Sequence, residues 1–143
     1  MSIEQITLFL EDSDARLTEV TELLAEHCIN IKALSLAGEN DTTVLRLIVN
    51  DTDKALQLFR ERGFNTGISE VLAMEVIDRP GGLATVLSTL HEARLAVACL
   101  TAFSLQAGKN GLVILRTGDQ EKAKTALQQN GIHLLSAEEL FTL

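Results

Sequence analysis

The second half of this chain repeats the first. At an offset of 66 residues, six positions carry the same residue: Asp12, Leu17, Val20, Leu24, Glu26 and Leu34 correspond to Asp78, Leu83, Val86, Leu90, Glu92 and Leu100. At an offset of 68, five more agree: Leu47, Asp51, Lys54, Ala55 and Gly63 correspond to Leu115, Asp119, Lys122, Ala123 and Gly131. The extra two residues fall in an expected hairpin loop, where insertions cost little. The matches lie at helix ends and apolar positions, so the pattern predicts two copies of one structural unit.

Each copy predicts the order strand, helix, strand, strand, helix, strand. Strands are expected at residues 6–10, 30–36, 43–49 and 64–69, and again at 71–77, 95–103, 112–115 and 132–136, with a tail at 138–143. The helices follow the acidic turn at 11–14, Asp51, the turn at 78–82 and Asp119. This order is typical of the ferredoxin-like α+β arrangement, in which two helices cover one face of an antiparallel sheet. We therefore expect two domains, 1–70 and 71–143, whose sheets join edge to edge.

The most distinctive stretch is Asp78-Arg79-Pro80-Gly81-Gly82-Leu83, between a strand and a helix. Pro80 is the only proline in the chain, and it favours extended backbone at the residue before it. Glycines without a Cβ allow another molecule to approach the backbone, and the start of a helix attracts a carboxylate. Asp78 could then hold an amino group. The alternative is a tight connection, capped by Asp78, that binds nothing.

Composition excludes several classes of partner. The net charge is −8, from 20 acidic and 12 basic residues, which argues against nucleic acid and anionic membranes. The chain has no Trp or Tyr on which bases could stack. It shows neither an apolar stretch of membrane-spanning length nor a signal-peptide pattern, so we expect a cytoplasmic protein.

Reactive side chains are few and scattered. His27, His91 and His133 show no metal-ligand spacing, and neither a phosphate loop nor a dinucleotide fingerprint is present. Cys28 and Cys99 are expected to be reduced, buried core thiols. We therefore expect no cofactor, no metal and no catalytic residue.

With the repeat, the hexapeptide resembles the start of an ACT domain, a small ligand-binding module of this strand and helix order. Its recurring feature is a strand that ends in Asp or Asn, followed by Pro-Gly and then a Leu that opens the first helix. Residues 78–86 match this well. The first copy keeps Asp12, Leu17 and Val20 but lacks the proline and both glycines. The whole chain resembles stand-alone proteins that consist of two ACT domains without a catalytic domain.

The resemblance implies a regulatory protein that binds a free amino acid where two ACT domains meet. Ligands in such proteins lie between the strand-to-helix loop of one domain and the second strand of another. The implied ligand-binding residues are Asp78, Arg79, Pro80, Gly81, Gly82 and Leu83, then Asp12, Ala15, Arg16 and Leu17 in the weaker copy, and Asn30, Ile31, Ala96 and Val97 on the strands.

Arg16 stands at the position equivalent to Gly82. It could pair with a ligand carboxylate, it could fill the first site and abolish it, or it could be a solvated surface arginine. We therefore expect the two sites to be inequivalent.

Three functional classes remain open: an amino-acid sensor, an interaction subunit that docks on a metabolic enzyme, and a small enzyme on a ferredoxin-like scaffold. The glycine-bearing loop favours the sensor, and the scarcity of reactive groups counts against the enzyme. Residues 43–49 are apolar on both faces of their strand, and only one face can meet the helices. We expect the helix-free faces to pack against a second copy in a homodimer.

Overall fold

The computed structural model describes residues 3–143 except 12, 40 and 107. The chain divides into two compact units. The first unit is Glu4–Ser69, and the second is Glu70–Leu143 together with Ile3. The strand β4, Asn65–Ile77, runs through the boundary, so its first residues belong to one unit and the rest to the other.

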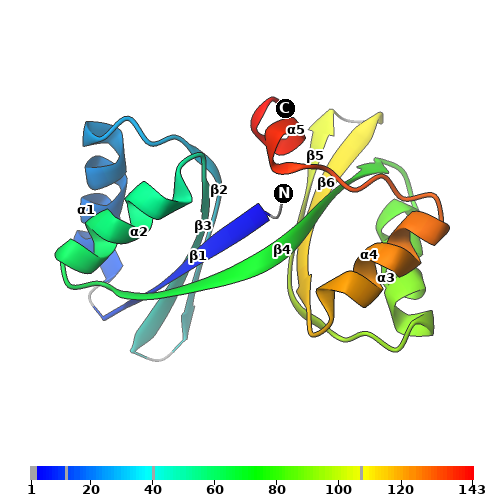
Figure 1. The fold of residues 1–143 in the computed structure, drawn as a ribbon, viewed down its shortest axis with the longest axis horizontal. Coiled ribbons are helices and arrows are strands. Elements are labelled where there is room, and N and C mark those ends of the chain that lie inside the picture. The colour runs from blue at the N-terminus through cyan, green and yellow to red at the C-terminus, as the bar shows by residue number, and fades with distance from the viewer. Residues whose placement is uncertain (1–2, 12, 40, 107) are drawn as a thin grey trace. The chain divides into compact units, whose positions relative to one another are not determined.

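The first unit follows the predicted element order. Its elements are β1 (Ile3–Leu10), α1 (Ser13–Glu26), β2 (Ile31–Glu39), β3 (Thr42–Val49) and α2 (Thr52–Glu61), followed by the start of β4. The strand order is β2-β3-β1-β4, and β3 is antiparallel to both β1 and β2. Both helices lie on the same face of these strands (Figure 1). This is the predicted ferredoxin-like arrangement.

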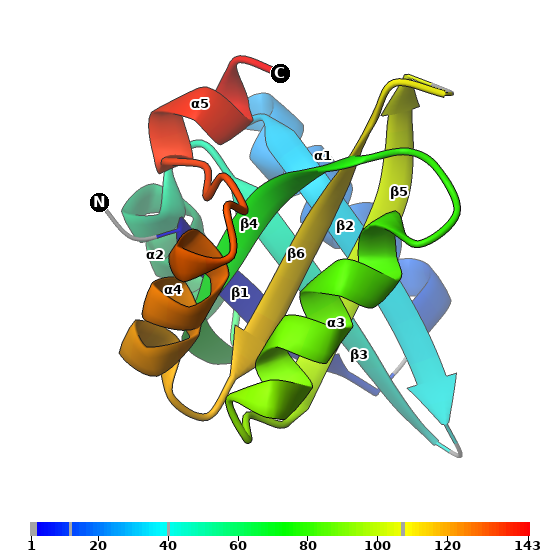
Figure 2. The same ribbon diagram turned by 90° about the vertical axis from the view of Figure 1, so that its right-hand side faces the viewer.

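The second unit contains the rest of β4, then α3 (Gly82–Glu92), β5 (Val97–Gln106), β6 (Asn110–Thr117), α4 (Gln120–Gln129) and α5 (Ala137–Phe141). Its strands follow the order β4-β6-β5, so the six strands form an antiparallel sheet in the order β2-β3-β1-β4-β6-β5. Helices α3 and α4 lie together on one face of the second unit's strands (Figure 2).

The two copies share the same strand register. Leu47 pairs with Ile6 and Leu34 in the first unit, and the equivalent Leu115 pairs with Leu72 and Leu100 in the second. The register shifts at equivalent places too, between Ile31 and Ala33 and between Val97 and Cys99. The duplication therefore preserves the backbone pairing of the sheet.

Each unit has its own apolar core between strands and helices. In the first unit the core includes Leu8, Leu47, Leu24 and Phe59, which are fully buried. In the second it includes Met74, Leu115, Leu90 and Leu127, which are also at most 1% exposed. Burying a side chain of this size contributes about 1.5–3 kcal/mol, so the two cores are the main source of stability.

All four long helices end in the same way. The second residue after the helix adopts a left-handed conformation, and the next N–H donates to a carbonyl five residues back. Gly63 and Gly131 take this position after α2 and α4, and Cys28 and Arg94 take it after α1 and α3, with φ of 56° and 61°. Cys28, at this helix end, is exposed, and Cys99 in β5 is only half-buried, so the prediction of two buried thiols was wrong. The core residue at the end of α1 is its neighbour Ile29.

Two predictions about strands also need correction. The segments at 64–69 and 71–77, predicted as separate strands, form the single strand β4. The predicted last strand at 132–136 is reduced to one bridge between Met74 and Leu134, and the predicted tail contains α5. A capping box explains α5, because Ser136 and Glu139 bond each other's backbone N–H at its start.

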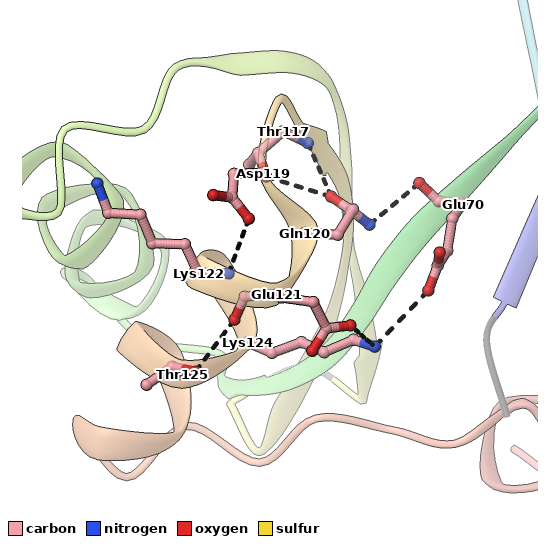
Figure 3. Close-up of polar contacts among 8 residues, drawn as sticks. All are labelled: Glu70, Thr117, Asp119, Gln120, Glu121, Lys122, Lys124 and Thr125. Carbon is pink, nitrogen blue, oxygen red and sulfur yellow. Dashed lines mark hydrogen bonds and ion pairs between the residues drawn. The ribbon is translucent and has the colours of Figure 1, made fainter.

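A polar network joins the start of α4 to β4 in the second unit (Figure 3). The side chain of Gln120 accepts from Thr117 and donates to the backbone oxygen of Glu70 at 3.0 Å. Lys124 lies between Glu121 and Glu70, at 3.2 and 3.6 Å. The pKa of Lys124 is raised, chiefly by its hydrogen bond to Glu121. These contacts fix α4 at the residue where the second unit begins.

Candidate functional site

The turn between β4 and α3 is held by its own backbone. Arg79 N–H donates to the Ile77 carbonyl at 2.9 Å, and Gly82 N–H donates to the Arg79 carbonyl at 3.0 Å. Gly81 has a φ of 91°, which side chains rarely tolerate. A Cβ on Gly82 would collide with the Ile77 carbonyl oxygen. Both glycines are therefore required by the geometry of the turn itself. The sequence pattern had suggested a different reason for them, the close approach of a ligand.

This turn makes α3 begin one helical turn later than α1. Both helices end at equivalent residues, Glu26 and Glu92, but α1 has 14 residues and α3 has 11. Residues 79–81 thus form an open turn where residues 13–15, Ala15 among them, form the first turn of α1. Asp12, the predicted site residue of the first copy, lies outside the described residues.

The start of α3 has no side-chain cap. Its N-cap residue is Gly81, whereas Asp51 and Asp119 accept backbone N–H groups at the starts of α2 and α4. The first internal bond of α3 runs from Thr85 N–H to the Gly81 carbonyl, which also accepts from the Thr85 hydroxyl. The N–H groups of Leu83 and Ala84 precede this bond and have no acceptor within the helix. With the helix dipole, they favour an anionic group.

Asp78 holds the hairpin between β5 and β6. Its Oδ2 accepts from the Ser104 hydroxyl at 2.7 Å and from Gly108 N–H at 3.2 Å, and its own N–H donates to the Lys109 carbonyl at 3.3 Å. One carboxylate oxygen is therefore engaged within the second unit. The described residues place no donor on the other oxygen, so a role in holding an amino group stays a prediction.

A cleft of about 460 Å³ opens beside this turn. Four segments of the second unit line it: the end of β4 at 75–77, the turn at 79–82, the start of α3 with Thr85 and Val86, and the connection at 130–133. Arg79, Pro80, Gly81 and Gly82 therefore lie in one cleft, and their role in binding a ligand stays a prediction. Leu83 is exposed and does not line the cleft.

The segment at 130–133 was not predicted to take part. It follows α4, and His133 within it bonds the Glu139 carboxylate of α5 at 3.0 Å. The pKa of Glu139 is lowered, first by the hydrogen bond from Ser136 N–H and then by His133. The internal repeat could have indicated this segment, because Gly63 and Gly131 end equivalent helices, each beside a strand-to-helix turn.

The predicted strand residues do not lie at this cleft. Within the second unit Val97 pairs with Thr117, whereas Ile77 at the turn pairs with Asn110 at the other end of β6. Val97, and Ala96 before it, are therefore at the far end of the strands from the turn. In the first unit, Asn30 and Ile31 are likewise remote, because Ile31 pairs with Val49 and Leu10 pairs with Thr43. No single unit brings the turn and strand residues together.

The first unit has an equivalent cleft of about 470 Å³, lined by Leu10, Glu11, Gly63, Asn65 and Arg16 among others. The Arg16 guanidinium lies over the Phe64 ring, 3.7 Å from its centre, and bonds the Glu19 carboxylate at 2.9 Å. Arg16 is thus held against the first unit by two contacts, with its side chain 32% exposed. Leu17, another predicted site residue, packs against the core.

The described residues contain no group of three or more His, Cys, Asp or Glu side chains that could hold a metal ion. Among the same residues, none of the helices is both long and apolar enough to cross a membrane.

The sequence matches the family profile described as ACT domain pair over residues 1–143. The chain belongs to the ACT domain pair family. Its identification as a tandem ACT protein, made from the repeat and the hexapeptide, is thereby confirmed. Among curated proteins, none matches the chain.

Solved structures show the same fold. Protein BT0572 from Bacteroides thetaiotaomicron is 34% identical, with a TM-score of 0.92, over 100% of this chain and 98% of that chain. The regulatory subunit of aspartate kinase from Thermus thermophilus is 15% identical, with a TM-score of 0.66, over 90% and 93% of the two chains. The corresponding subunit from Thermus flavus is 14% identical, with a TM-score of 0.62 over 90% and 92%. At such low identity the Thermus proteins share the ACT fold alone.

Replacement of the two turn glycines by alanine should have unequal effects. Gly82→Ala should lower the free energy of unfolding by about 2–3 kcal/mol, because the new Cβ meets the Ile77 carbonyl oxygen. Gly81→Ala should lower it by only about 1–2 kcal/mol, because the new Cβ has open space around it and the only cost is the strain of the positive φ. Urea denaturation of both variants measures the difference. Equal costs, or a larger cost at Gly81, would contradict the steric explanation.

Proposed function

We propose that this ACT domain pair is a non-catalytic regulatory protein that binds one free amino acid at the β4–α3 turn. The observation that carries the proposal is the uncapped start of α3, which lies in the cleft of the second unit. The family membership supports a regulatory, ligand-binding role.

The carboxylate of the ligand binds at the start of α3. The Leu83 and Ala84 N–H groups supply donors there, and Arg79 on the same cleft supplies a positive charge. The amino group binds toward Asp78, whose second oxygen accepts no bond from the described residues. The turn thus offers a positive charge and hydrogen-bond donors at one end and a carboxylate at the other. These match the carboxylate and the amino group of an amino acid.

A homodimer is part of the proposal. Phe9 of β1 and Phe103 of β5 remain 44% and 42% exposed, and each lies on the strand face opposite the helix-covered core. Ile48 on the corresponding face of β3 is already buried within the chain, so the apolar surface left for a second copy is smaller than expected from the sequence. Light scattering at tens of micromolar should give twice the chain mass of 15.5 kDa. A single-chain mass would contradict the dimer.

Regulation implies a partner, and we propose a metabolic enzyme. Two proteins of the same fold are themselves regulatory subunits of such an enzyme, aspartate kinase. A pull-down with the purified, ligand-saturated chain that recovers no enzyme would count against this part of the proposal.

The ligand proposal predicts a thermal shift. At about 100 times the dissociation constant, a ligand adds roughly 2.7 kcal/mol to the stability of the folded state, which raises Tm by several degrees. At least one of the twenty amino acids should produce this shift. Arg79→Gln should weaken the binding of that amino acid about fivefold, as measured by calorimetry, because it removes a charge worth about 1 kcal/mol.

The matched control is Arg60→Gln, which removes the same charge from the exposed face of α2 in the first unit. It should leave the affinity unchanged. Absence of any shift at millimolar concentrations of all twenty amino acids would contradict the proposed function.

A further inference from the structure

We infer that the amino acid taken by this cleft has an aliphatic side chain, as in valine, leucine or isoleucine. The inference rests on the proposed function, which assigns binding partners to the amino and carboxylate groups of the ligand. It concerns the side chain of the ligand.

The floor of the cleft is branched and apolar. Val76 from β4, Val86 from α3 and Ile132 after α4 line it, and all three belong to or pack against the core of the second unit. Val86 is almost fully buried, and Val76 and Ile132 are half-buried. A ligand side chain placed here leaves water for an apolar surface, so a hydroxyl or charge without a partner is penalised.

The charged side chains that line the cleft already have partners or another role. Glu75 accepts from Asn110 at 3.2 Å, and His133 bonds Glu139 at 3.0 Å. Arg79 is assigned to the ligand carboxylate. A cationic ligand side chain would therefore compete with Asn110 for the Glu75 carboxylate, and the described lining contains no Phe, Tyr or Trp ring on which an aromatic one could stack.

In the first unit, the residue equivalent to Ile132 is covered by a side chain of the protein itself. Phe64 is equivalent to Ile132, and it is only 6% exposed, because it packs against Phe59 in the core and the Arg16 guanidinium lies over its ring. Arg16 is equivalent to Gly82, which has no side chain. The second cleft is therefore the same structure without its cover, and an aliphatic side chain of the ligand supplies that cover.

Calorimetry with near-isosteric pairs tests the inference. Valine should bind at least tenfold more tightly than threonine, and leucine at least tenfold more tightly than asparagine or aspartate, because the polar member buries groups without partners. The stoichiometry should be one ligand per chain, since Arg16 in the lining of the first cleft replaces the glycine of the second. Tightest binding by a polar, charged or aromatic amino acid would overturn the inference while leaving the proposed function intact. No binding by any amino acid would remove both.

Val76→Thr keeps the shape of the floor and adds a hydroxyl to it. It should weaken the binding of valine and leucine several-fold, and it should reduce the ratio of their affinities to those of threonine and asparagine. The control is Val44→Thr, the same change at a half-buried strand position of the first unit that lies outside the cleft. It should leave both affinities unchanged. Equal effects of the two variants would overturn the assigned floor.

Discussion

The close approach of the Gly82 backbone to the Ile77 carbonyl oxygen determines the shape of the β4–α3 turn. It allows the chain to leave β4, turn within residues 78–81 and enter α3 without the helical turn that α1 has at the same place. The helix start then lacks a side-chain cap, and its first residue, Gly82, lines a cleft. These features depend on the absence of a Cβ at Gly82 and on the positive φ of Gly81.

The duplicated units show how one fold can be conserved while its sites diverge. The register around Leu47 and Leu115, the bulges at β2 and β5, and the left-handed helix ends recur in both copies, because they hold the sheet and helices together. The strand-to-helix turns differ. In the first unit Arg16 lies over Phe64, whereas the equivalent Gly82 of the second unit has no side chain to lie over Ile132. The two clefts therefore have similar volumes but different chemistry.

Periodicity and the internal repeat predicted the element order and the ferredoxin-like fold, because strands and helices with one buried face leave a strong pattern. The bridge at Leu134 was predicted as a full strand, since a short apolar segment looks the same whether it pairs once or throughout. α5 was missed although Ser136 and Glu139 have the spacing of a capping box. For the site, the sequence located the turn, but the bonds of Asp78 to the distant β5–β6 hairpin depend on tertiary structure.

The central claim is that the β4–α3 turn binds the ligand and its counterpart in the first unit does not. Backbone amide NMR of the full chain, titrated with the tightest-binding amino acid, tests it most directly. The account predicts the largest shifts at Gly81, Gly82, Leu83 and Ala84, with smaller ones at Gly131 and Ile132, and little change at Arg16 and Leu17. Comparable shifts at both turns, or the largest shifts away from α3, would contradict it.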